Sequence, residues 1–387
     1  MMHTKINGLR IEVIESEEGF LAIKDEWDAL IDKSINPTFY STYPFVFTVW
    51  KNFKNENNRL FILLVRRDAV LVGIAPFRIE CTMVGKIRLF RKIKYIAEWG
   101  EGDKPSIIST EKQSYILDRI FQFLNGEFTQ WDEIQLMEQP ENSPFLKQSF
   151  FGNKWYSTMV VPKNPSFYIS IAGTWEEYLM TRGKNTHKTW TRYRKKLYDL
   201  SEGVLFQCYD DPEFVSESLK RFIAIEQSGW KKGQEFSVGG NEKKKRFYEE
   251  LLVLLVHKKM AAIYLLTSGT TDIAGIIVYK YNSIVYMAHI TYRPTYAKYS
   301  PGIILNAEII KTLFGTIYHE YDFLIFERKD EKSLYKKKWS TGSRQTMTIK
   351  VSKRNIRRFL FILEECAKKV LLNIMRRMTK LSKYLPY

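Results

Sequence analysis

A short run, Ser300-Pro301-Gly302, has the residue types that start a helix and leave its first amides accessible. Serine is a favoured N-cap residue, proline at the first helical position loses no useful donor, and glycine keeps side-chain bulk away from an approaching group. Because a helix N-terminus attracts anions, the run predicts a phosphate-type site. The residues that would contact the anion are Arg293, Lys298, Ser300, Gly302 and Ile303. The alternative is that Ser-Pro-Gly only begins a helix.

The formal net charge of +17 also favours anionic partners such as nucleotides, nucleic acid or acidic lipid. Two segments hold much of this charge. The run 182–196 contains seven Lys or Arg residues and no acid, and in 351–387 the basic residues far outnumber Glu364 and Glu365. Either run could instead be a solvated helix face.

Composition excludes several classes of protein. The isolated cysteines Cys81, Cys208 and Cys366 indicate a reducing compartment, not a disulfide framework or a zinc site. No two of the five histidines have a spacing that aims both at one ion, so we expect no metal. The longest apolar runs, 60–65 and 251–256, are far shorter than the roughly 20 residues of a membrane-spanning helix. Since the first residues lack the apolar stretch of a secretory signal, we expect a cytoplasmic protein.

The strands and helices that would position the Ser-Pro-Gly run occur twice along the chain, in the same order. The first copy has a strand at 10–15, a helix at 20–33 with a second helix from residue 43, a hairpin at 59–78, a strand at 85–97, a helix at 111–125 and a strand at 132–138. The second copy has them at 167–171, 174–231, 261–279, 284–291, 301–319 and 322–327. Local sequence repeats as well, since Val72-Gly-Ile-Ala75 matches Ala274-Gly-Ile-Ile277 and Trp131-Asp-Glu-Ile134 matches Tyr321-Asp-Phe-Leu324. These matches predict a degenerate internal duplication.

The duplication predicts an α/β protein of two tandem units, each with a mixed central sheet flanked by helices. We expect the units at 1–162 and 163–352, followed by a C-terminal basic helix at 353–387. The second unit is longer because it contains inserted helices at 185–200 and 213–231. Asp211 and Pro212 give the second of these helices a favourable start.

Four segments, 175–200, 226–230, 300–302 and 322–339, follow one another in the order of a known family. The last contains the pattern Tyr335-Lys-x-x-Trp339. By this order the chain resembles the CelD-type acetyltransferases of the GNAT superfamily (acyl-CoA N-acyltransferases). These are linked with cellulose or exopolysaccharide biosynthesis and are similar to Fem-type peptidyltransferases in having a doubled domain. The resemblance implies two tandem GNAT-like domains, and transfer from acetyl-CoA or another acyl-CoA to an amine or hydroxyl of a sugar or polysaccharide precursor.

GNAT enzymes hold the cofactor pyrophosphate on backbone amides of the loop after the fourth strand, which is 293–302 in this chain. The resemblance therefore implies that the Ser-Pro-Gly run binds acyl-CoA. It further implies that backbone amides of the preceding strand polarise the donor carbonyl, where losing one such donor typically costs about 10²- to 10³-fold in rate. The strand residues concerned are Ala288, His289 and Ile290. The loop has one glycine where the common GNAT pattern has two.

The equivalent stretch of the first copy, 97–106, contains three acids that would repel a pyrophosphate, so we expect that copy to be a scaffold that helps bind the acceptor.

Direct acyl transfer also needs a base for the acceptor and an acid for the leaving thiolate. GNAT enzymes often place a tyrosine after the next strand, near the leaving sulfur, and this position implies that Tyr335 is the acid. Lys336 beside it would stabilise negative charge, and Glu226 on the inserted helix is a candidate base or acceptor contact. The alternatives are that Tyr335 serves packing and that Glu226 is an ordinary exposed glutamate.

Two other functions remain open. A Fem-like transferase would take its acyl group from charged tRNA and deliver it to a cell-wall precursor, and the basic run 182–196, with Trp190 and Tyr193, would suit an RNA backbone. A binding protein without catalysis could also retain this fold. The tail from Lys353 alternates apolar and basic positions at helical spacing. We expect it either to lie on anionic membrane, which would place the protein at the inner face of the membrane, or to pack on the second unit.

Overall fold

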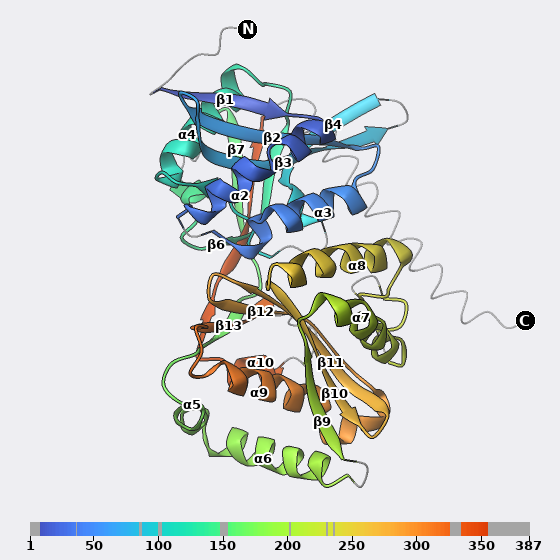
Figure 1. Ribbon diagram of the computed structural model, residues 1–387. Coiled ribbons are helices and arrows are strands. Elements are labelled where there is room, and N and C mark those ends of the chain that lie inside the picture. Colours follow the sequence, from blue (N-terminus) through green and yellow to red (C-terminus); the bar gives the residue numbers. More distant parts are fainter. Residues whose placement is uncertain are drawn as a thin grey trace, which may run out of the picture.

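The computed structural model describes residues 8–35, 37–84, 87–99, 103–147, 154–200, 203–229, 231–234, 237–325 and 334–354. Its two sheets follow one another along the length of the molecule, and helices pack against each (Figure 1). The predicted C-terminal helix lies, from residue 355 onward, outside the described residues.

The first sheet is mixed and has the strand order β1-β2-β3-β4-β6-β15-β7, with β5 paired to β3. Its strands are β1 (Leu9–Ile14), β2 (Asn58–Arg67), β3 (Val70–Val84), β4 (Ile87–Tyr95), β5 (Ile108–Ser109), β6 (Glu133–Pro140), β7 (Tyr156–Pro162) and β15 (Thr346–Lys353). The α-helices of this unit are α1 (Glu17–Ala22), α2 (Lys24–Asp32), α3 (Tyr43–Phe53) and α4 (Gln113–Gly126). Short 3-10 turns are η1 (Phe39–Ser41), η2 (Ile96–Glu98) and η3 (Pro144–Lys147).

The second sheet is also mixed and has the order β14-β8-β13-β12-β11-β10-β9. Its strands are β8 (Ser166–Ser170), β9 (Val204–Tyr209), β10 (Ala261–Ser268), β11 (Thr271–Tyr281), β12 (Ile284–Tyr292), β13 (Glu320–Ile325) and β14 (Gly342–Arg344). The helices are α5 (Trp175–Thr181), α6 (Lys184–Tyr198), α7 (Pro212–Gln227), α8 (Glu242–His257), the 3-10 turn η4 (Pro294–Tyr299), α9 (Pro301–Leu313) and α10 (Leu334–Trp339). The predicted architecture of two mixed sheets flanked by helices is confirmed.

Helix α7 begins as its sequence predicts. The Asp211 carboxylate accepts the Glu213 backbone N–H at 2.9 Å, and Pro212 occupies the first turn. The buried face of α7 and that of α8 then pack into a core that also contains the aromatic residues of α2 and α3 from the first unit. Phe39 of η1 stacks on Tyr279 of β11 with ring centroids 4.3 Å apart. The two units therefore share one continuous apolar core.

Strand β15 joins the units a second time. It follows the whole second unit in the chain, yet it lies between β6 and β7 in the first sheet (Figure 1). Val351 is opposite Ile134 on one side and Thr158 on the other. The range 163–352 that we expected for the second unit therefore contains residues that complete the first sheet.

In each sheet, one pair of neighbouring strands is parallel and is paired over only a few residues. In the first sheet β4 and β6 are paired at Lys92 with Glu133 and at Ile93 with Ile134. The equivalent pair in the second sheet is β12 with β13. Both β6 and β13 also contain a non-glycine residue with positive φ, Glu138 at 55° and Leu324 at 60°. The second strand of each parallel pair is thus bent at a similar point.

Candidate functional site

The parallel strands β12 and β13 separate after three paired positions and leave a wedge between them. The last pair is Tyr286 with Asp322. Beyond it β12 continues along β11 as far as Tyr292, while β13 shifts register against β8 and ends at Ile325. Since each strand then has a partner on one side only, the backbone groups of β12 that point away from β11 face this wedge.

A β-bulge distorts β12 within the wedge. Ile277 of β11 is opposite His289 and Val278 is opposite Met287, so Ala288 is an extra residue on β12. Bulges of this kind redirect backbone groups and are common next to active sites. The residues predicted from the sequence at this place, Ala288, His289 and Ile290, therefore lie on one stretch of distorted strand.

Two side chains, one from α8 and one from the turn after α7, contact this stretch. The His289 Nε2 lies 2.5 Å from the hydroxyl of Tyr248, which is fully buried on α8. The Lys231 Nζ donates to the Ile290 carbonyl at 2.7 Å. Lys231 therefore contacts the backbone of β12 in the stretch that extends beyond the last pair with β13.

Tyr335 and Lys336 of α10 lie at the wedge, as the sequence predicts for groups that act beside the donor. The Tyr335 hydroxyl is 3.8 Å from the Met287 sulfur on β12, and its ring contacts Phe323 of β13 edge-on at 6.2 Å. The Lys336 Nζ donates to the Phe323 carbonyl at 3.0 Å. The pair thus spans the gap between the two strands. Their part in catalysis remains a prediction.

The start of α9 packs closely on β12. A Cβ atom added to Gly302 would lie 3.3 Å from the Ile290 Cδ1, so glycine permits this close approach. Ser300 occupies the N-cap position, but its left-handed backbone (φ 52°) holds its side chain out of a capping hydrogen bond. The first amides of α9 therefore lack the serine cap that the sequence predicted.

The two cations expected near that helix start have local contacts. The Arg293 Nε donates to the Asp272 carbonyl at 2.6 Å and so holds the end of β12 against the start of β11. The Lys298 Nζ lies 5.0 Å from the centroid of the Tyr299 ring. The role of both in anion binding remains a prediction.

Glu226 of α7 is fully buried, although an exposed glutamate was the alternative that we considered. Its Oε2 accepts the Gly239 backbone N–H at 3.0 Å, while Oε1 has no hydrogen-bond partner among the described residues. The carboxylate therefore holds the segment before α8 against α7. Its role as a base or acceptor contact remains a prediction.

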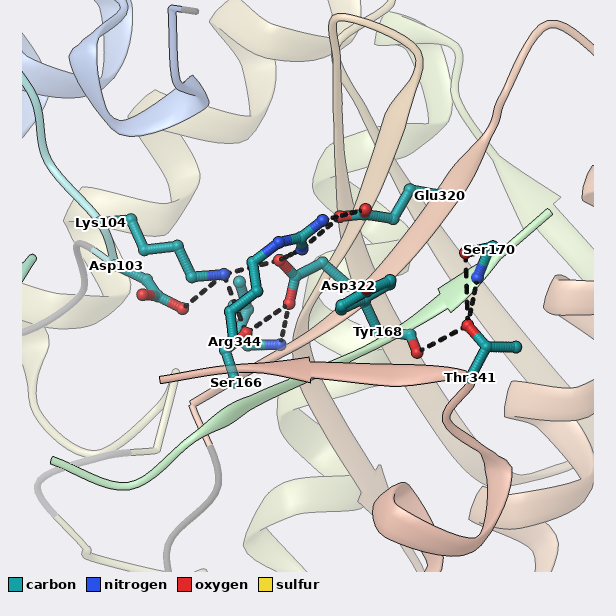
Figure 2. A network of polar contacts seen from close by, with 10 residues as sticks. Asp103, Lys104, Ser166, Tyr168, Ser170, Glu320, Asp322, Thr341 and Arg344 are labelled. Carbon is teal, nitrogen blue, oxygen red and sulfur yellow. Dashed lines mark hydrogen bonds and ion pairs between the residues drawn. The ribbon is translucent and has the colours of Figure 1, made fainter. Parts of the chain in front are cut away.

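A buried polar network occupies the junction between the units, beside the last pair of β12 and β13 (Figure 2). Lys104 of the first unit reaches into the second, where its Nζ donates to the Asp322 Oδ2 at 2.6 Å and to the Ser166 Oγ at 2.8 Å. The other oxygen of Asp322 accepts the Ser166 hydroxyl at 2.9 Å and the Leu324 amide at 2.7 Å. Burial would raise the pKa of Asp322, but Lys104 and these hydrogen bonds outweigh burial and lower it.

Arg344 of β14 extends this network at its other end. Its guanidinium binds both carboxylate oxygens of Glu320, with one distance of 2.8 Å, and lies 3.7 Å from Asp322. It also stacks over the Tyr168 ring at 3.9 Å. Two carboxylates of β13 are thus held by one cation from each unit.

Three further acids at the junction lack comparable partners. Both oxygens of Asp103 and one oxygen of Glu98 are buried with no hydrogen-bond partner among the described residues. Burial raises the pKa of Asp103 to about 6, that of Glu98 to about 7 and that of Glu138 to about 8, and the charge of at least one neighbouring acid adds to each shift. The sequence drew attention to acids in 97–106 only as groups that repel pyrophosphate. It gave no sign that Lys104, Asp322 and Arg344 would meet.

In the first sheet, the equivalent gap between β4 and β6 is filled by residues of the first unit. The Glu98 Oε1 accepts the Met137 backbone N–H of β6 at 2.5 Å, and the Gln139 side chain donates to the Pro105 carbonyl at 2.9 Å. Glu98 therefore satisfies a backbone N–H of β6, and Pro105 accepts a side chain of the same strand. This arrangement supports the expectation that the first unit does not bind an acyl donor.

The basic run 182–196 forms the end of α5 and most of α6. Lys188, Arg192, Lys195 and Lys196 are exposed. Trp190 and Tyr193, in contrast, pack against the core of the second unit. The cations could contact an RNA backbone, but these two aromatic rings are directed inward, away from any base that would stack on them.

Among the described residues, no group of three or more His, Cys, Asp or Glu side chains is arranged to hold a metal ion. The same part of the chain contains no helix with the length and apolar character required to cross a membrane.

Comparison with known proteins supports the assignment of the second unit. Residues 184–337 match the family model described as an acetyltransferase (GNAT) domain. The solved structure of FemX is similar over 91% of this chain and 99% of its own, with 10% identity and a TM-score of 0.59. A conserved protein of unknown function from Bacteroides thetaiotaomicron matches over 89% of this chain and 100% of its own, with 9% identity and a TM-score of 0.55.

A third similar structure is the C-terminal domain of a putative lysylphosphatidylglycerol synthetase from Agrobacterium fabrum. It covers 90% of this chain and 96% of its own, with 8% identity and a TM-score of 0.52. No curated protein matches the sequence. At such low identity the structural matches show the shared fold alone, whereas the family match covers the strands β12 and β13, the start of α9 and Tyr335. The protein is therefore an acyltransferase whose second unit carries a GNAT acetyltransferase domain.

Proposed function

We propose that the second unit transfers an acyl group from acetyl-CoA or another acyl-CoA to an amine or hydroxyl of a sugar or polysaccharide precursor. The observation that carries this proposal is the wedge between β12 and β13, which is distorted by the bulge at Ala288 and contacted by the N-terminus of α9. A thioester donor supplies the activated acyl carbon. The wedge is open on the side of β12 where backbone amides can approach the carbonyl oxygen of that carbon.

Each part of the wedge has a role in this proposal. The amides at the start of α9, near Gly302, hold the pyrophosphate, because a helix N-terminus combines unpaired N–H groups with a favourable dipole. Backbone N–H groups near Ala288 hydrogen-bond the oxygen on which negative charge develops. Tyr335, which lies against Met287, donates a proton to the leaving sulfur, and Lys336 stabilises the charge that results.

The junction between the units is where we place the acceptor. It borders the wedge at Tyr286 and Asp322, and it contains polar groups from both units. The resemblance to the CelD-type acetyltransferases supports a sugar or polysaccharide precursor as the acceptor. A basic tail on anionic membrane would bring the protein close to a lipid-linked precursor of this kind.

Donor identity is the first property to test. Isothermal titration of the purified full-length protein with acetyl-CoA should give one site per chain, and mass spectrometry of the denatured protein should detect CoA thioesters that it retained. Binding of acetyl-CoA with no binding of charged tRNA would support the proposal. Salt-sensitive tRNA binding without CoA binding would overturn it in favour of a Fem-like transferase, and absence of both would favour a binding protein.

A further inference from the structure

Helix α6 presents four cations to solvent, Lys188, Arg192, Lys195 and Lys196. The first three recur at i, i+4 and i+7, so they project from one side of the helix, and like charges at this spacing destabilise a helix. In the part of the chain that the structure describes, none of the four belongs to an ion pair. The first turn of α6 also contains no acid that would interact favourably with the helix dipole. An anionic partner would relieve this repulsion.

The other side of α6 is fixed to the second unit. Trp190 and Tyr193 pack against the core of that unit, and the Arg194 Nε donates to the Glu308 carboxylate of α9 at 2.7 Å. Figure 1 shows α6 at the end of the molecule opposite β1. The four cations therefore have a defined place on a surface that lies outside the junction between the units.

A groove of about 480 Å³ lies between α5 and α6, and its lining residues are Glu176, Leu179, Met180, Gly183 and His187. Met180 is 77% exposed. Ile317, which is 79% exposed, follows α9 in a turn whose Phe314 ring lies 5.9 Å from the Trp175 ring of α5. Within the described ranges these are the two most exposed large apolar side chains. Apolar groups and cations therefore gather at one end of the second unit.

The charge around this groove is positive overall. Residues 174–200 contain seven Lys or Arg residues against the acids Glu176, Glu177 and Asp199. Exposed apolar groups combined with cations are typical of surfaces that lie on anionic membrane. A nucleic-acid backbone would meet the same cations, but Trp190 and Tyr193 are directed inward, away from any base. The exposed apolar side chains thus favour lipid as the partner.

We propose that α5 and α6 dock on an anionic phospholipid surface, with lipid phosphates at the exposed cations of α6 and lipid acyl carbons at Met180 and the groove. This inference goes beyond the proposed acyl transfer and does not depend on the donor. Because α6 lies against α9, the membrane would lie on the side of the second sheet that α9 covers. A basic patch of this size attaches only weakly, and stable attachment takes a second contact, for which the basic tail from Lys353 is suited.

Chemical footprinting of the wild-type, full-length protein tests which face meets the lipid. An amine-reactive acetylating reagent is applied with and without vesicles of equal phosphatidylserine and phosphatidylcholine, and modified peptides are quantified by mass spectrometry. We expect the acetylation of Lys188, Lys195 and Lys196 to fall several-fold in these vesicles and to stay unchanged in phosphatidylcholine alone. The exposed Lys33 and Lys147 of the first unit are internal controls and should react equally in all samples.

Charge reversal tests the cations. Lys188→Glu combined with Lys195→Glu should weaken vesicle binding by about 30-fold or more, because each cation near an anionic surface contributes about fivefold in affinity. Both new acids would lie three or four positions from Arg192, a favourable spacing, so the melting temperature should not fall. Lys33→Glu combined with Lys147→Glu changes the net charge equally, but its effect on binding should stay within about threefold because distant exposed charges are screened. Co-sedimentation over a range of lipid concentrations measures both variants.

A second pair of variants tests the apolar contact. Met180→Gln keeps the length and the helix propensity of the side chain and removes apolar surface, so it should weaken vesicle binding by about threefold or more. The matched control is Met159→Gln on β7 of the first unit, where the methionine is 52% exposed. This control should bind vesicles like the wild type.

Three results would overturn the inference. Acetylation of the α6 lysines that vesicles leave unchanged would do so, as would protection confined to lysines of the tail. Protection by poly(U) RNA and not by vesicles would assign this surface to nucleic acid instead. Equal losses of binding in the two charge-reversal variants would also count against a defined face, because vesicles would then respond to net charge alone. The proposed acyl transfer is tested separately, by titration with acetyl-CoA.

Discussion

Tyr286 and Asp322 form the last parallel pair between β12 and β13, and both the wedge and the junction network begin at this pair. Asp322 uses its side chain to bind Lys104 of the first unit, while its backbone still belongs to the sheet of the second. The geometry of the wedge is therefore tied to the position of the first unit. Variants at the junction should change transfer even where they leave the donor loop untouched.

Tyr335→Phe should lower kcat while donor affinity stays within a few-fold, because the hydroxyl is needed only as the thiolate departs. A loss of about 10²-fold is typical of a missing general acid. Steady-state kinetics with titration of acetyl-CoA checks this expectation. Since phenylalanine preserves the ring contact with Phe323, a variant with full turnover would show that Tyr335 serves packing.

Gly302→Glu should abolish acetyl-CoA binding, because it puts negative charge at the amides proposed to hold the pyrophosphate. Gly302→Ala is the matched control. Its Cβ would lie 3.3 Å from the flexible Ile290 Cδ1, with the Ile290 Cγ1 and the Tyr292 Cδ1 at 3.6 Å, so we expect weaker binding by less than about tenfold. Calorimetric titration of both variants measures the difference, and circular dichroism confirms that each is folded. Unchanged affinity in Gly302→Glu would remove the start of α9 from the donor site.

Lys104→Met should destabilise the protein by about 3–5 kcal/mol, since it leaves the buried carboxylate of Asp322 without its cation. The double variant Lys104→Met with Asp322→Asn should recover part of this loss, because the charge that Lys104 binds most closely is then removed together with it. Urea unfolding of the single and double variants tests the coupling. Strictly additive losses would mean that the two residues do not depend on each other.

Stability should fall as pH rises from about 5 to about 8. The pKa values of Asp103, Glu98 and Glu138 are raised by burial to about 6, 7 and 8, so in this window the folded state binds more protons than the unfolded state. The free energy of unfolding therefore decreases with increasing pH. Glu80, whose pKa is lowered to about 2 by Lys94 and Arg78 despite burial, contributes stability that is lost only in stronger acid.

Urea unfolding at several pH values checks this slope. Glu138→Gln should flatten it, because that variant no longer gains a charge near pH 8, whereas the exposed control Glu141→Gln should not. A free energy of unfolding that rises between pH 5 and 8 would contradict the burial of these three acids as charged groups.

A chain ended after Arg354 should fold normally and lose attachment to anionic vesicles. Strand β15 extends to Lys353, so this truncation keeps the first sheet complete. Near an acidic surface each Lys or Arg contributes about 1 kcal/mol, and the tail contains several. Co-sedimentation with phosphatidylserine vesicles compares the two chains. Equal pelleting, or unfolding of the shorter chain, would favour a tail that packs on the second unit.

Much of the fold could be predicted because periodicity and caps are local. Asp211 and Pro212 predicted the start of α7, and the repeated order, with Ala274-Gly-Ile-Ile277 matching Val72-Gly-Ile-Ala75, predicted the hairpin of β10 and β11. Strands β5, β7, β9, β14 and β15 were missed. β9 is short and lies at a sheet edge, and β15 is specified mainly by its contacts with β6 and β7, which lie about 200 residues earlier in the chain.

Part of the candidate site could be predicted from the sequence in the same way, and part could not. The Ser-Pro-Gly run predicted Gly302, and the family resemblance implied Ala288 and Tyr335. The structure brings Ala288 and Tyr335 to one wedge, with Gly302 against Ile290 beside it. The sequence did not predict the junction, because Lys104 and Asp322 are separated by 218 positions and neither stands in a distinctive pattern. Charge partners from different units are visible only once the units are packed together.

The place of β15 has a consequence for how the polypeptide is made. When residues 1–162 have emerged from the ribosome, β6 and β7 are exposed but the strand that belongs between them is not yet available. Until residues 346–353 emerge, both strands have open edges that could pair with a neighbouring chain. The amino-terminal half therefore cannot complete its fold during synthesis, and it should not be obtainable as a separate fragment unless residues 346–353 are supplied with it.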